Sequence, residues 1–199
     1  VPANWRGCRP KPRRGCASPS IVVMRKPSSF PGHNVASMLE RTARGWPSLP
    51  ALARGTVAIC DYATLAARAS RVAGALEASG LRRGERVALV SRNVPAYIEA
   101  LFGCWWAGLV AVPVNAKLHP KELAFVLANS GARCVFADAP WRAAIGRFPA
   151  VGAALAVVEF GGAEYAQLLA ATPREKPAAC AAADPAWLFY TSGTTGRPK

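Results

Sequence analysis

The stretch LRRGERVALVSRNVPAYIEALFGCWWAGLVAVPVNAKLHPKELAFVLANSGARCVFAD, residues 81–138, alternates short apolar runs with longer segments of helical periodicity. Buried strands are predicted where the apolar runs lie, at 85–90, 109–115 and 132–138. The intervening segments, 94–108 and 119–131, begin near a proline and end near a glycine, which predicts helices. Strands separated by helices predict right-handed crossovers, and therefore an α/β fold: a parallel sheet with helices on both faces.

The same alternation continues on both sides of this stretch. Upstream, YATLAARASRVAGALEASG places four apolar residues on one helical face: Leu65, Ala69, Val72 and Leu76. Downstream, the pattern predicts a helix at Trp141–Phe148, a strand at Ala156–Phe160, a helix at Ala163–Ala170 and a last strand at AWLFY, residues 186–190. The alternation therefore predicts one continuous α/β unit.

An uncharged run covers Ala100–Val114, 15 residues in all. As a single helix it would span about 22 Å, which is short of the roughly 30 Å hydrocarbon core of a bilayer. Three residues are also expected to break it into helix, turn and strand: Gly103, Gly108 and Pro113. We therefore predict no transmembrane segment here, and we expect Trp105 and Trp106 to lie in the core or at a subunit interface.

The formal net charge of +14 is unevenly distributed. Residues 1–26 carry seven Lys or Arg and no acid, whereas the remainder carries 18 basic and 11 acidic side chains, a net +7. The remainder shows no cluster of basic residues interleaved with aromatic ones, so specific nucleic-acid binding is disfavoured.

Residues 1–30 form a basic, proline-rich segment without helical or strand periodicity. Its apolar stretch is too short for a secretory signal, and its prolines would break an amphipathic transit helix. Two interpretations remain open: a disordered basic arm that contacts anionic lipid or nucleic acid, or a non-native extension upstream of a true start at Met24. Because the sequence begins with Val, we favour the start at Met24 and expect residues 1–23 to be dispensable.

The six cysteines show no CxxC spacing, and the two histidines pair with none of them: Cys8, Cys16, Cys60, Cys104, Cys134 and Cys180, with His33 and His119. A metal site is therefore not expected. A disulfide framework is also disfavoured in a chain of this size and apolar content, so buried reduced thiols are expected.

The sequence ends on LFYTSGTTGRPK, residues 188–199, in which an apolar run leads into two glycines, four Ser or Thr hydroxyls, one Arg and one Lys. Such a loop offers many N–H and O–H donors to a polyphosphate. It is not a Walker A loop, because Lys does not directly follow the second glycine. Composition alone would favour a solvated hairpin rich in turn residues.

The whole string YTSGTTGRPK resembles the phosphate loop of the adenylate-forming superfamily, which includes acyl-CoA synthetases, adenylation domains of nonribosomal peptide synthetases and luciferases. The stretch 81–138 resembles the N-terminal subdomain of the same family, and the similarity runs from about Asn34 to Lys199. Residues 31–199 are therefore expected to be the N-terminal part of an AMP-binding domain, incomplete at its C-terminus.

This resemblance implies a reaction in two steps. A carboxylate attacks the α-phosphate of ATP to give an acyl-adenylate and pyrophosphate, and a thiol, usually coenzyme A, then displaces AMP. The residues implied to bind the ATP phosphates, with Mg²⁺ sharing the charge, are Thr191, Ser192, Gly193, Thr194, Thr195, Gly196 and Lys199. No catalytic or metal-ligating residue is expected in this stretch, so the 199 residues alone are expected to be an inactive fragment.

Two positions depart from the family pattern. His119 stands where the family more often has Thr or Ser, and we interpret it as a helix cap with no catalytic role. The segment RGTVAICDYATL, residues 54–65, is shorter than the usual hairpin between these elements and is expected to be a shortened turn.

The resemblance favours a cytoplasmic ligase for fatty or aryl acids, with peripheral membrane attachment and a homodimeric parent left open. An adenylation domain that loads a carrier protein and a non-catalytic remnant that acts as an interaction module remain the alternatives.

Overall fold

The structure, a computed structural model, describes residues 34–148 and 155–191, all within the unit that spans Pro31–Lys199. The predicted extension at residues 1–30 lies outside the described residues. The elements follow one another as α1 (Ala36–Gly45), β1 (Pro50–Arg54), β2 (Val57–Asp61), α2 (Tyr62–Ala78), β3 (Arg86–Val90), α3 (Pro95–Trp106), β4 (Val110–Val114), α4 (Pro120–Ser130), β5 (Cys134–Ala137), α5 (Ala139–Ile145), β6 (Ala156–Glu159) and α6 (Ala163–Ala170).

The main sheet has the strand order β4-β3-β5-β6, and every neighbouring pair is parallel. At its centre, Val87 of β3 pairs with Ala111 of β4 on one side and with Cys134 of β5 on the other. The strands of such a sheet are covered on both faces, which requires near-continuous apolar sequences such as RVALV and CVFA. The α/β fold with a parallel sheet, predicted from the sequence, is confirmed.

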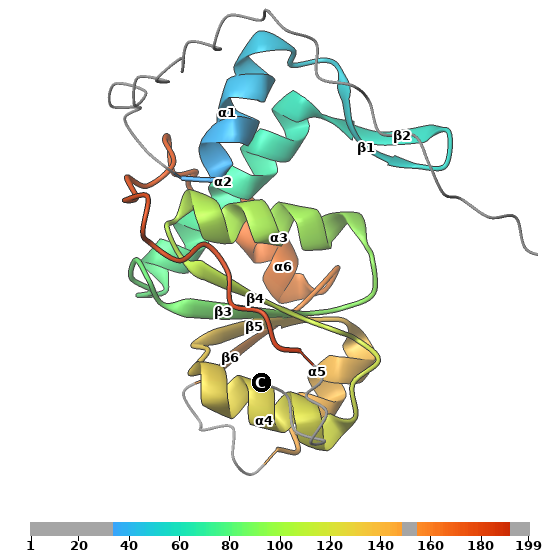
Figure 1. Ribbon diagram of the computed structural model, residues 1–199. Coiled ribbons are helices and arrows are strands. Elements are labelled where there is room, and N and C mark those ends of the chain that lie inside the picture. Colours follow the sequence, from blue (N-terminus) through green and yellow to red (C-terminus); the bar gives the residue numbers. More distant parts are fainter. Residues whose placement is uncertain (1–33, 149–154, 192–199) are drawn as a thin grey trace, which may run out of the picture. The chain divides into compact units, whose positions relative to one another are not determined.

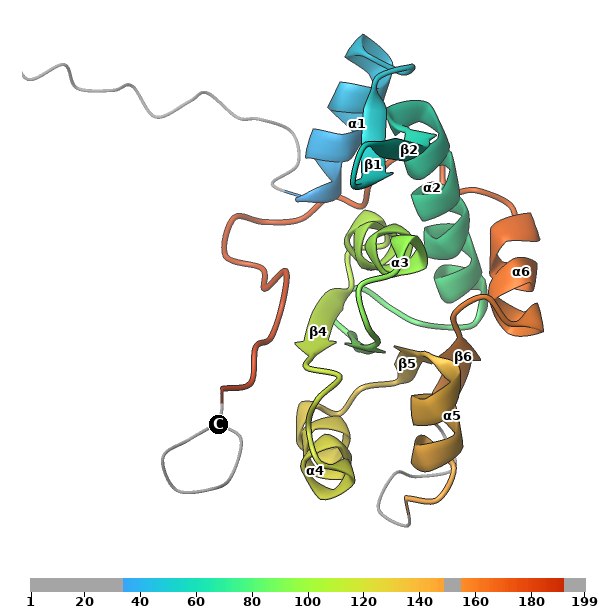
Figure 2. The same cartoon turned by 90° about the vertical axis from the view of Figure 1, so that its right-hand side faces the viewer.

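Helices cover both faces of this sheet, as predicted (Figures 1 and 2). Successive residues of β3 point to opposite sides: Val87 and Leu89 belong to the core beneath α2, α3 and α6, whereas Ala88 and Val90 belong to the core shared with α4 and α5. This alternation is the two-residue period of a strand. The helix that follows β3 and the helix that follows β4 therefore lie on opposite faces.

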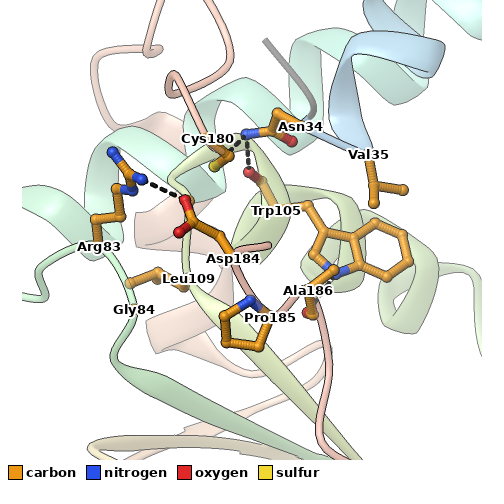
Figure 3. Close-up of a pocket in the computed structure, with 11 residues that line it drawn as sticks. Asn34, Val35, Arg83, Gly84, Trp105, Leu109, Cys180, Asp184, Pro185 and Ala186 are labelled. Carbon is orange, nitrogen blue, oxygen red and sulfur yellow. Dashed lines mark hydrogen bonds and ion pairs between the residues drawn. The ribbon is translucent and has the colours of Figure 1, made fainter. Parts of the chain in front are cut away.

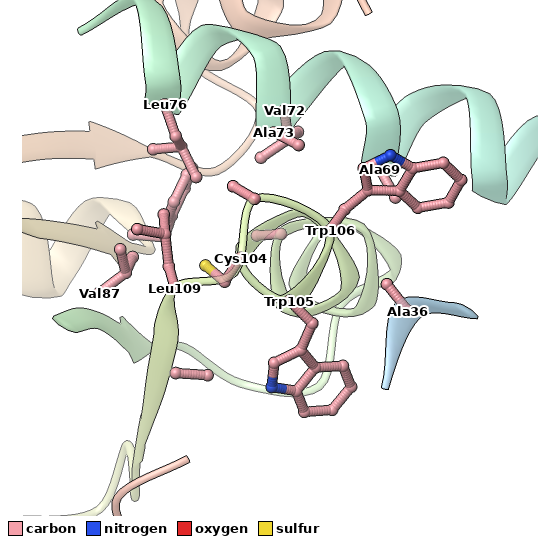
Figure 4. Packing of buried hydrophobic residues seen from close by; sticks show 14 of the residues in the cluster. Ala36, Ala69, Val72, Ala73, Leu76, Val87, Cys104, Trp105, Trp106 and Leu109 are labelled. Atoms are coloured by element: carbon pink, nitrogen blue, oxygen red, sulfur yellow. The ribbon is translucent and has the colours of Figure 1, made fainter. Parts of the chain in front are cut away.

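The closest helix pair is α2 with α3. The four residues predicted to share one face of α2 are all buried: Leu65, Ala69, Val72 and Leu76. Val72 faces Gly103 of α3 (Figure 4 shows this core), where an added Cβ atom would lie 2.6 Å from Cγ1 of Val72 and 2.8 Å from its Cβ. The two helices can approach this closely only because Gly103 has no side chain.

The predicted division of the run Ala100–Val114 is correct in outline and wrong in detail. Gly108 has a φ of +73° and forms the turn between α3 and β4. Gly103 instead lies inside α3, and Pro113 lies inside β4. Pro113 is tolerated because β4 borders the sheet, so that its missing N–H faces away from the partner strand.

The predicted strand AWLFY forms only an isolated parallel bridge between Ala111 and Trp187. The N–H of Ala111 donates to the carbonyl of Ala186 (3.0 Å), and the N–H of Leu188 donates to the carbonyl of Ala111 (2.8 Å). The next residue of β4 whose backbone nitrogen faces away from β3 is Pro113, which has no N–H to donate and so cannot extend the pairing. The prediction of a full strand was therefore wrong.

The bounds of one predicted helix need correction. The helix predicted at Trp141–Phe148 is observed as Ala139–Ile145, because Pro140 fits the first turn of a helix and allows it to start directly after Asp138. The segment 54–65, expected to be a shortened turn, contains a tight two-residue loop, β2 and the start of α2, and Arg54 pairs with Val57 across this loop in the antiparallel β1–β2 hairpin.

A buried carboxylate connects three helices. Glu99 of α3 is 4% exposed, and its Oε2 accepts a hydrogen bond from the hydroxyl of Tyr165 in α6 (2.7 Å). Nε of Arg68 in α2 lies 3.1 Å from the same oxygen and forms an ion pair with it. Burial and the contact with Glu99 raise the pKa of Tyr165, so its hydroxyl remains protonated and can donate.

Trp105 and Trp106 are buried, as expected for core residues. Among the described residues, none of the helices combines the length and the apolar character that a membrane span requires.

The four cysteines of the described ranges are free thiols. Cys104 and Cys134 are buried as predicted, whereas Cys60 and Cys180 are only half-buried; Cys8 and Cys16 lie outside the described residues.

We predict that Gly103→Ala destabilises the fold by about 1–3 kcal/mol, because the new methyl group overpacks the contact with Val72. Gly45→Ala is the matched control: it also lies in a helix, and an added Cβ atom there meets nothing within 4 Å. Urea unfolding of both variants measures the difference. Equal stability of the two would contradict the close packing of α2 against α3.

Thiol labelling tests the packing of the core. Burial raises the pKa of Cys134 to about 12, and it raises that of Cys104 as well, so neither thiol is ionised at neutral pH. Burial also raises the pKa of the half-buried Cys60 and Cys180 thiols, so we expect N-ethylmaleimide at pH 7.5 to modify these two slowly in the native protein, and Cys104 and Cys134 only in urea. Peptide mass spectrometry identifies the modified residues, and native labelling of Cys104 as fast as that of Cys60 would contradict the structure.

Candidate functional site

An open cleft of about 770 Å³ lies at the carboxyl ends of β3 and β4. The chain leaves β3 towards α3 on one face of the sheet and leaves β4 towards α4 on the other, so the two loops diverge. In open α/β sheets, ligands bind in the crevice outside the carboxyl ends of the strands, where such connections diverge. The lining residues are Ser91, Arg92, Asn93, Tyr97, Pro113, Val114, Asn115, Ala116, Lys117, Phe189 and Tyr190.

The chemistry of this cleft suits an anionic ligand. Arg92 and Lys117 are exposed cations on its two sides, one after β3 and the other after β4. The loop after β3 is held by the backbone N–H of Arg92, which donates to Oδ2 of Asp138 (3.4 Å). The loop after β4 is held by the backbone N–H of Lys117, which donates to Oδ1 of Asn115 (2.9 Å). Both cations therefore project from loops fixed by local hydrogen bonds.

Tyr97 and Tyr190 provide further hydroxyl groups in the cleft. Burial raises the pKa of both, so each hydroxyl stays protonated at neutral pH. The hydroxyl of Tyr190 donates to Oδ1 of Asn129 in α4 (2.6 Å), which fixes the chain just before Thr191.

Thr191, the first of the predicted phosphate-binding residues, lies beside the cleft. It lines a neighbouring hollow of about 320 Å³ that shares Pro113, Val114 and Asn115 with the cleft. The bridge between Ala111 and Trp187 thus carries the chain along the edge of β4 to the carboxyl end of the sheet. The other predicted phosphate ligands lie outside the described residues: Ser192, Gly193, Thr194, Thr195, Gly196 and Lys199.

His119 lies at the N-terminus of α4, as expected for a helix cap. Its imidazole Nδ1 accepts a hydrogen bond from the backbone N–H of Lys121 (3.2 Å), and the backbone N–H of His119 donates to Oε2 of Glu122 (2.9 Å). These reciprocal bonds satisfy the free N–H groups of the first turn. The imidazole is therefore engaged in capping.

A second hollow, of about 210 Å³, lies at the opposite end of the strands (Figure 3). Its polar groups are paired with one another: Arg83 forms an ion pair with Asp184, and Nδ2 of Asn34 lies 3.7 Å from Sγ of Cys180. Burial raises the pKa of the Cys180 thiol, which disfavours the reactive thiolate. This hollow therefore offers less to a ligand than the cleft at the carboxyl ends.

Asn34 is a structural residue that the sequence did not reveal. It is 6% exposed, and its Nδ2 donates to the carbonyls of Trp105 (2.6 Å) and Ala178 (2.9 Å). Its Oδ1 accepts from the N–H of Ala36 (2.8 Å), at the start of α1. An Asn next to a helix start commonly signals a side-chain bond to the first turn, so the sequence could have indicated the bond to Ala36. It could not indicate the bonds to Trp105 and Ala178, because these partners lie 71 and 144 residues away.

A sequence profile described as "AMP-binding enzyme" matches residues 39–199. The chain belongs to this AMP-binding family. The match covers the parallel sheet, the helices on both of its faces, and the segment that leads to Thr191. The resemblance to adenylate-forming enzymes, drawn from the terminal loop and from residues 81–138, is therefore confirmed.

Similar curated proteins are ligases of carboxylic acids. A feruloyl-CoA synthase from Amycolatopsis sp is 40% identical over 159 residues, which cover 80% of this chain and 31% of that protein. The long-chain-fatty-acid–CoA ligase FadD13 of Mycobacterium tuberculosis is 34% identical over 170 residues, which cover 83% and 34%. The fatty acid–[acyl-carrier-protein] ligase ScoC of Streptomyces coeruleorubidus is 37% identical over 140 residues, which cover 69% and 27%. The chain thus spans about a third of the length of these relatives.

Solved structures agree with this assignment. The inhibitor-bound crystal structure of the N-terminal domain of FACL13 from Mycobacterium tuberculosis superposes with a TM-score of 0.72 at 32% identity. The alignment covers 83% of this chain and 43% of that domain. The fold is therefore that of an N-terminal part of an adenylate-forming enzyme.

We predict that Asn34→Ala lowers the free energy of unfolding by about 1–3 kcal/mol, because two buried carbonyls lose their donor. Asn34→Asp is expected to cost more, since a carboxylate would face both carbonyl oxygens. Asn93→Ala, at an exposed position, serves as the control and is expected to change stability by no more than about 0.5 kcal/mol. Urea unfolding measures all three, and a stable Asn34→Asp variant would refute the role of this side chain.

Proposed function

We propose that this chain is the N-terminal part of an ATP-dependent acid–thiol ligase that forms an acyl-adenylate and transfers the acyl group to coenzyme A. The observation that carries the proposal is the string YTSGTTGRPK, placed directly after the segment that bridges to β4, in a chain of the AMP-binding family. In this assignment residues 31–199 are the N-terminal part of the AMP-binding domain, and residues 1–30 are an extension.

In the proposed reaction, the terminal loop holds the β- and γ-phosphates of ATP. Backbone N–H groups at Gly193 and Gly196 and the hydroxyls of the Ser and Thr residues would donate to phosphate oxygens, while Lys199 would supply a positive charge. These groups would stabilise the charge that develops on the leaving pyrophosphate. Arg92 and Lys117, at the mouth of the neighbouring cleft, would add a positive field that favours the approach of a polyanion.

The proposed reaction includes Mg²⁺ as the companion of ATP. The part of the chain that the structure describes contains no group of three or more His, Cys, Asp or Glu side chains arranged to hold a metal ion. We therefore assign the metal no ligand among these residues and route no step through it.

The relatives support a fatty or an aryl acid as the substrate, since their names include both a long-chain-fatty-acid–CoA ligase and a feruloyl-CoA synthase. The relative ScoC, named as an acyl-carrier-protein ligase, favours a second candidate function, in which the acyl group is loaded onto a carrier protein. Release of AMP with coenzyme A, compared with release in the presence of a phosphopantetheinylated carrier protein, distinguishes the two. A remnant that acts only as an interaction module would support neither reaction.

We also propose a cytoplasmic location for the complete protein. Its basic residues 1–26 would give weak, salt-sensitive attachment to anionic membranes, because an attraction between surface charges is screened by salt. Homodimerisation of the complete enzyme is part of the same proposal.

The assay that tests the proposed function is carboxylate-dependent ATP–pyrophosphate exchange. We predict exchange by the full-length protein that carries this chain and none by the 199 residues alone, because one loop cannot orient a carboxylate against the α-phosphate. In the full-length protein, Thr194→Ala, Thr195→Ala and Lys199→Ala are each expected to lower kcat/KM roughly 10- to 150-fold, the effect of a lost charge-assisted hydrogen bond.

The control for these variants is folding stability, which is expected to remain unchanged because the substituted side chains are polar. If the full-length protein with Thr194→Ala and Lys199→Ala together kept full exchange activity, the loop would not bind phosphate and the proposed function would fail.

A further inference from the structure

Two adjacent tryptophans at the end of α3 hold the segment that returns to the sheet after α6. The indole N–H of Trp105 donates to the carbonyl of Ala186 (2.8 Å), and that of Trp106 donates to the carbonyl of Arg174 (3.0 Å). The rings are 6% and 4% exposed, and they leave α3 on different sides (Figure 4). The two side chains are therefore alike in chemistry and burial, and they differ in the backbone carbonyl that accepts their indole N–H.

The residue held by Trp105, Ala186, lies shortly before Thr191, the first residue of the candidate phosphate loop. The carbonyl of Ala186 accepts two hydrogen bonds, one from Trp105 and one from the N–H of Ala111 in β4 (3.0 Å). The ring of Trp105 also packs edge-on against Trp187, with 5.0 Å between ring centroids. Figure 3 shows Trp105 and Ala186 side by side at the edge of the hollow.

Few contacts fix this segment before Thr191. Within the described residues, its backbone pairs with the sheet in one parallel bridge at Ala111, and Pro113 cannot donate the next backbone bond. Nearer to Thr191, the hydroxyl of Tyr190 donates to Oδ1 of Asn129 in α4 (2.6 Å). Trp187 and Phe189 are 46% and 57% exposed, so their rings are only partly anchored in the core. The indole N–H of Trp105 is thus a main restraint on the direction in which the chain approaches Thr191.

We infer that Trp105 is a positioning residue for ATP: it sets the place of Ala186 and thereby that of the loop that begins at Thr191. This inference rests on the proposed function, because it requires the loop to bind phosphate. Trp106 has no such role, since Arg174 lies 17 residues before Thr191 and is held separately through its N–H, which donates to the carbonyl of Ser70 (2.9 Å).

The test compares Trp105→Phe with Trp106→Phe in the full-length protein that carries this chain. Each change keeps an aromatic ring and removes one indole N–H, so similar decreases in Tm are expected from both. In ATP–pyrophosphate exchange, Trp105→Phe is expected to raise the KM for ATP about 3- to 10-fold, the effect of losing one hydrogen bond to the segment that places the loop. The KM for the carboxylic acid is expected to stay within about twofold. Trp106→Phe is expected to leave both KM values unchanged.

If Trp105→Phe does not fold, benzothienylalanine in place of Trp105 retains the bicyclic ring and lacks only the N–H donor, and the same replacement of Trp106 is its control. A selective rise in the KM for ATP supports the inference. Equal effects of the two replacements on the KM for ATP would overturn it and leave both residues as core packing.

The variant Lys199→Ala separates this inference from the proposed function. If Lys199→Ala abolishes exchange while Trp105→Phe behaves like Trp106→Phe, only the positioning role fails. If Lys199→Ala has no effect, the loop does not bind phosphate, and the proposed function fails together with the inference that rests on it.

Discussion

The close approach of α2 and α3 is the constraint on which the arrangement of this chain depends. Because Gly103 has no side chain, the backbone of α3 packs directly against Val72 of α2, and both helices lie over one face of the sheet. The buried Glu99 fixes the same helix through Arg68 and Tyr165. Replacing such a buried pair by apolar groups can be neutral, whereas removing one partner leaves an uncompensated charge. The network therefore specifies the position of α3 more than it adds to stability.

With α3 in place, its C-terminal end organises the chain that returns from α6. Trp105 and Trp106 hold two points of the returning segment, and Asn34 ties the carbonyl of Trp105 to that of Ala178. Buried polar groups are costly unless paired, so these bonds oppose displacement of the segment. The segment is thus fixed mainly by side-chain hydrogen bonds, from the end of α3, from Asn34 and through Tyr190 to Asn129, although it forms a single bridge with the sheet.

The parallel sheet then determines where a ligand can bind. All four strands end at the same edge, and the loops after β3 and β4 diverge to opposite faces and leave the cleft with Arg92 and Lys117. The returning segment brings Thr191 to this same edge. The match to the AMP-binding family and the placement of Thr191 at this edge are the two observations on which the proposed phosphate binding rests.

The sequence by itself determined the fold class, the buried face of α2, the helical cap at His119 and the family, because local periodicity, turn residues and a ten-residue motif are contained in short stretches of chain. It did not determine the roles of Asn34, Gly103 or Glu99. Their partners lie on other elements, and the local sequence around a residue does not indicate which distant side chains will pack against it. The extent of AWLFY was overestimated for the same reason, since the pairing ends at Pro113 of a different strand. Only the tertiary structure decided that two neighbouring tryptophans hold separate points of the returning segment.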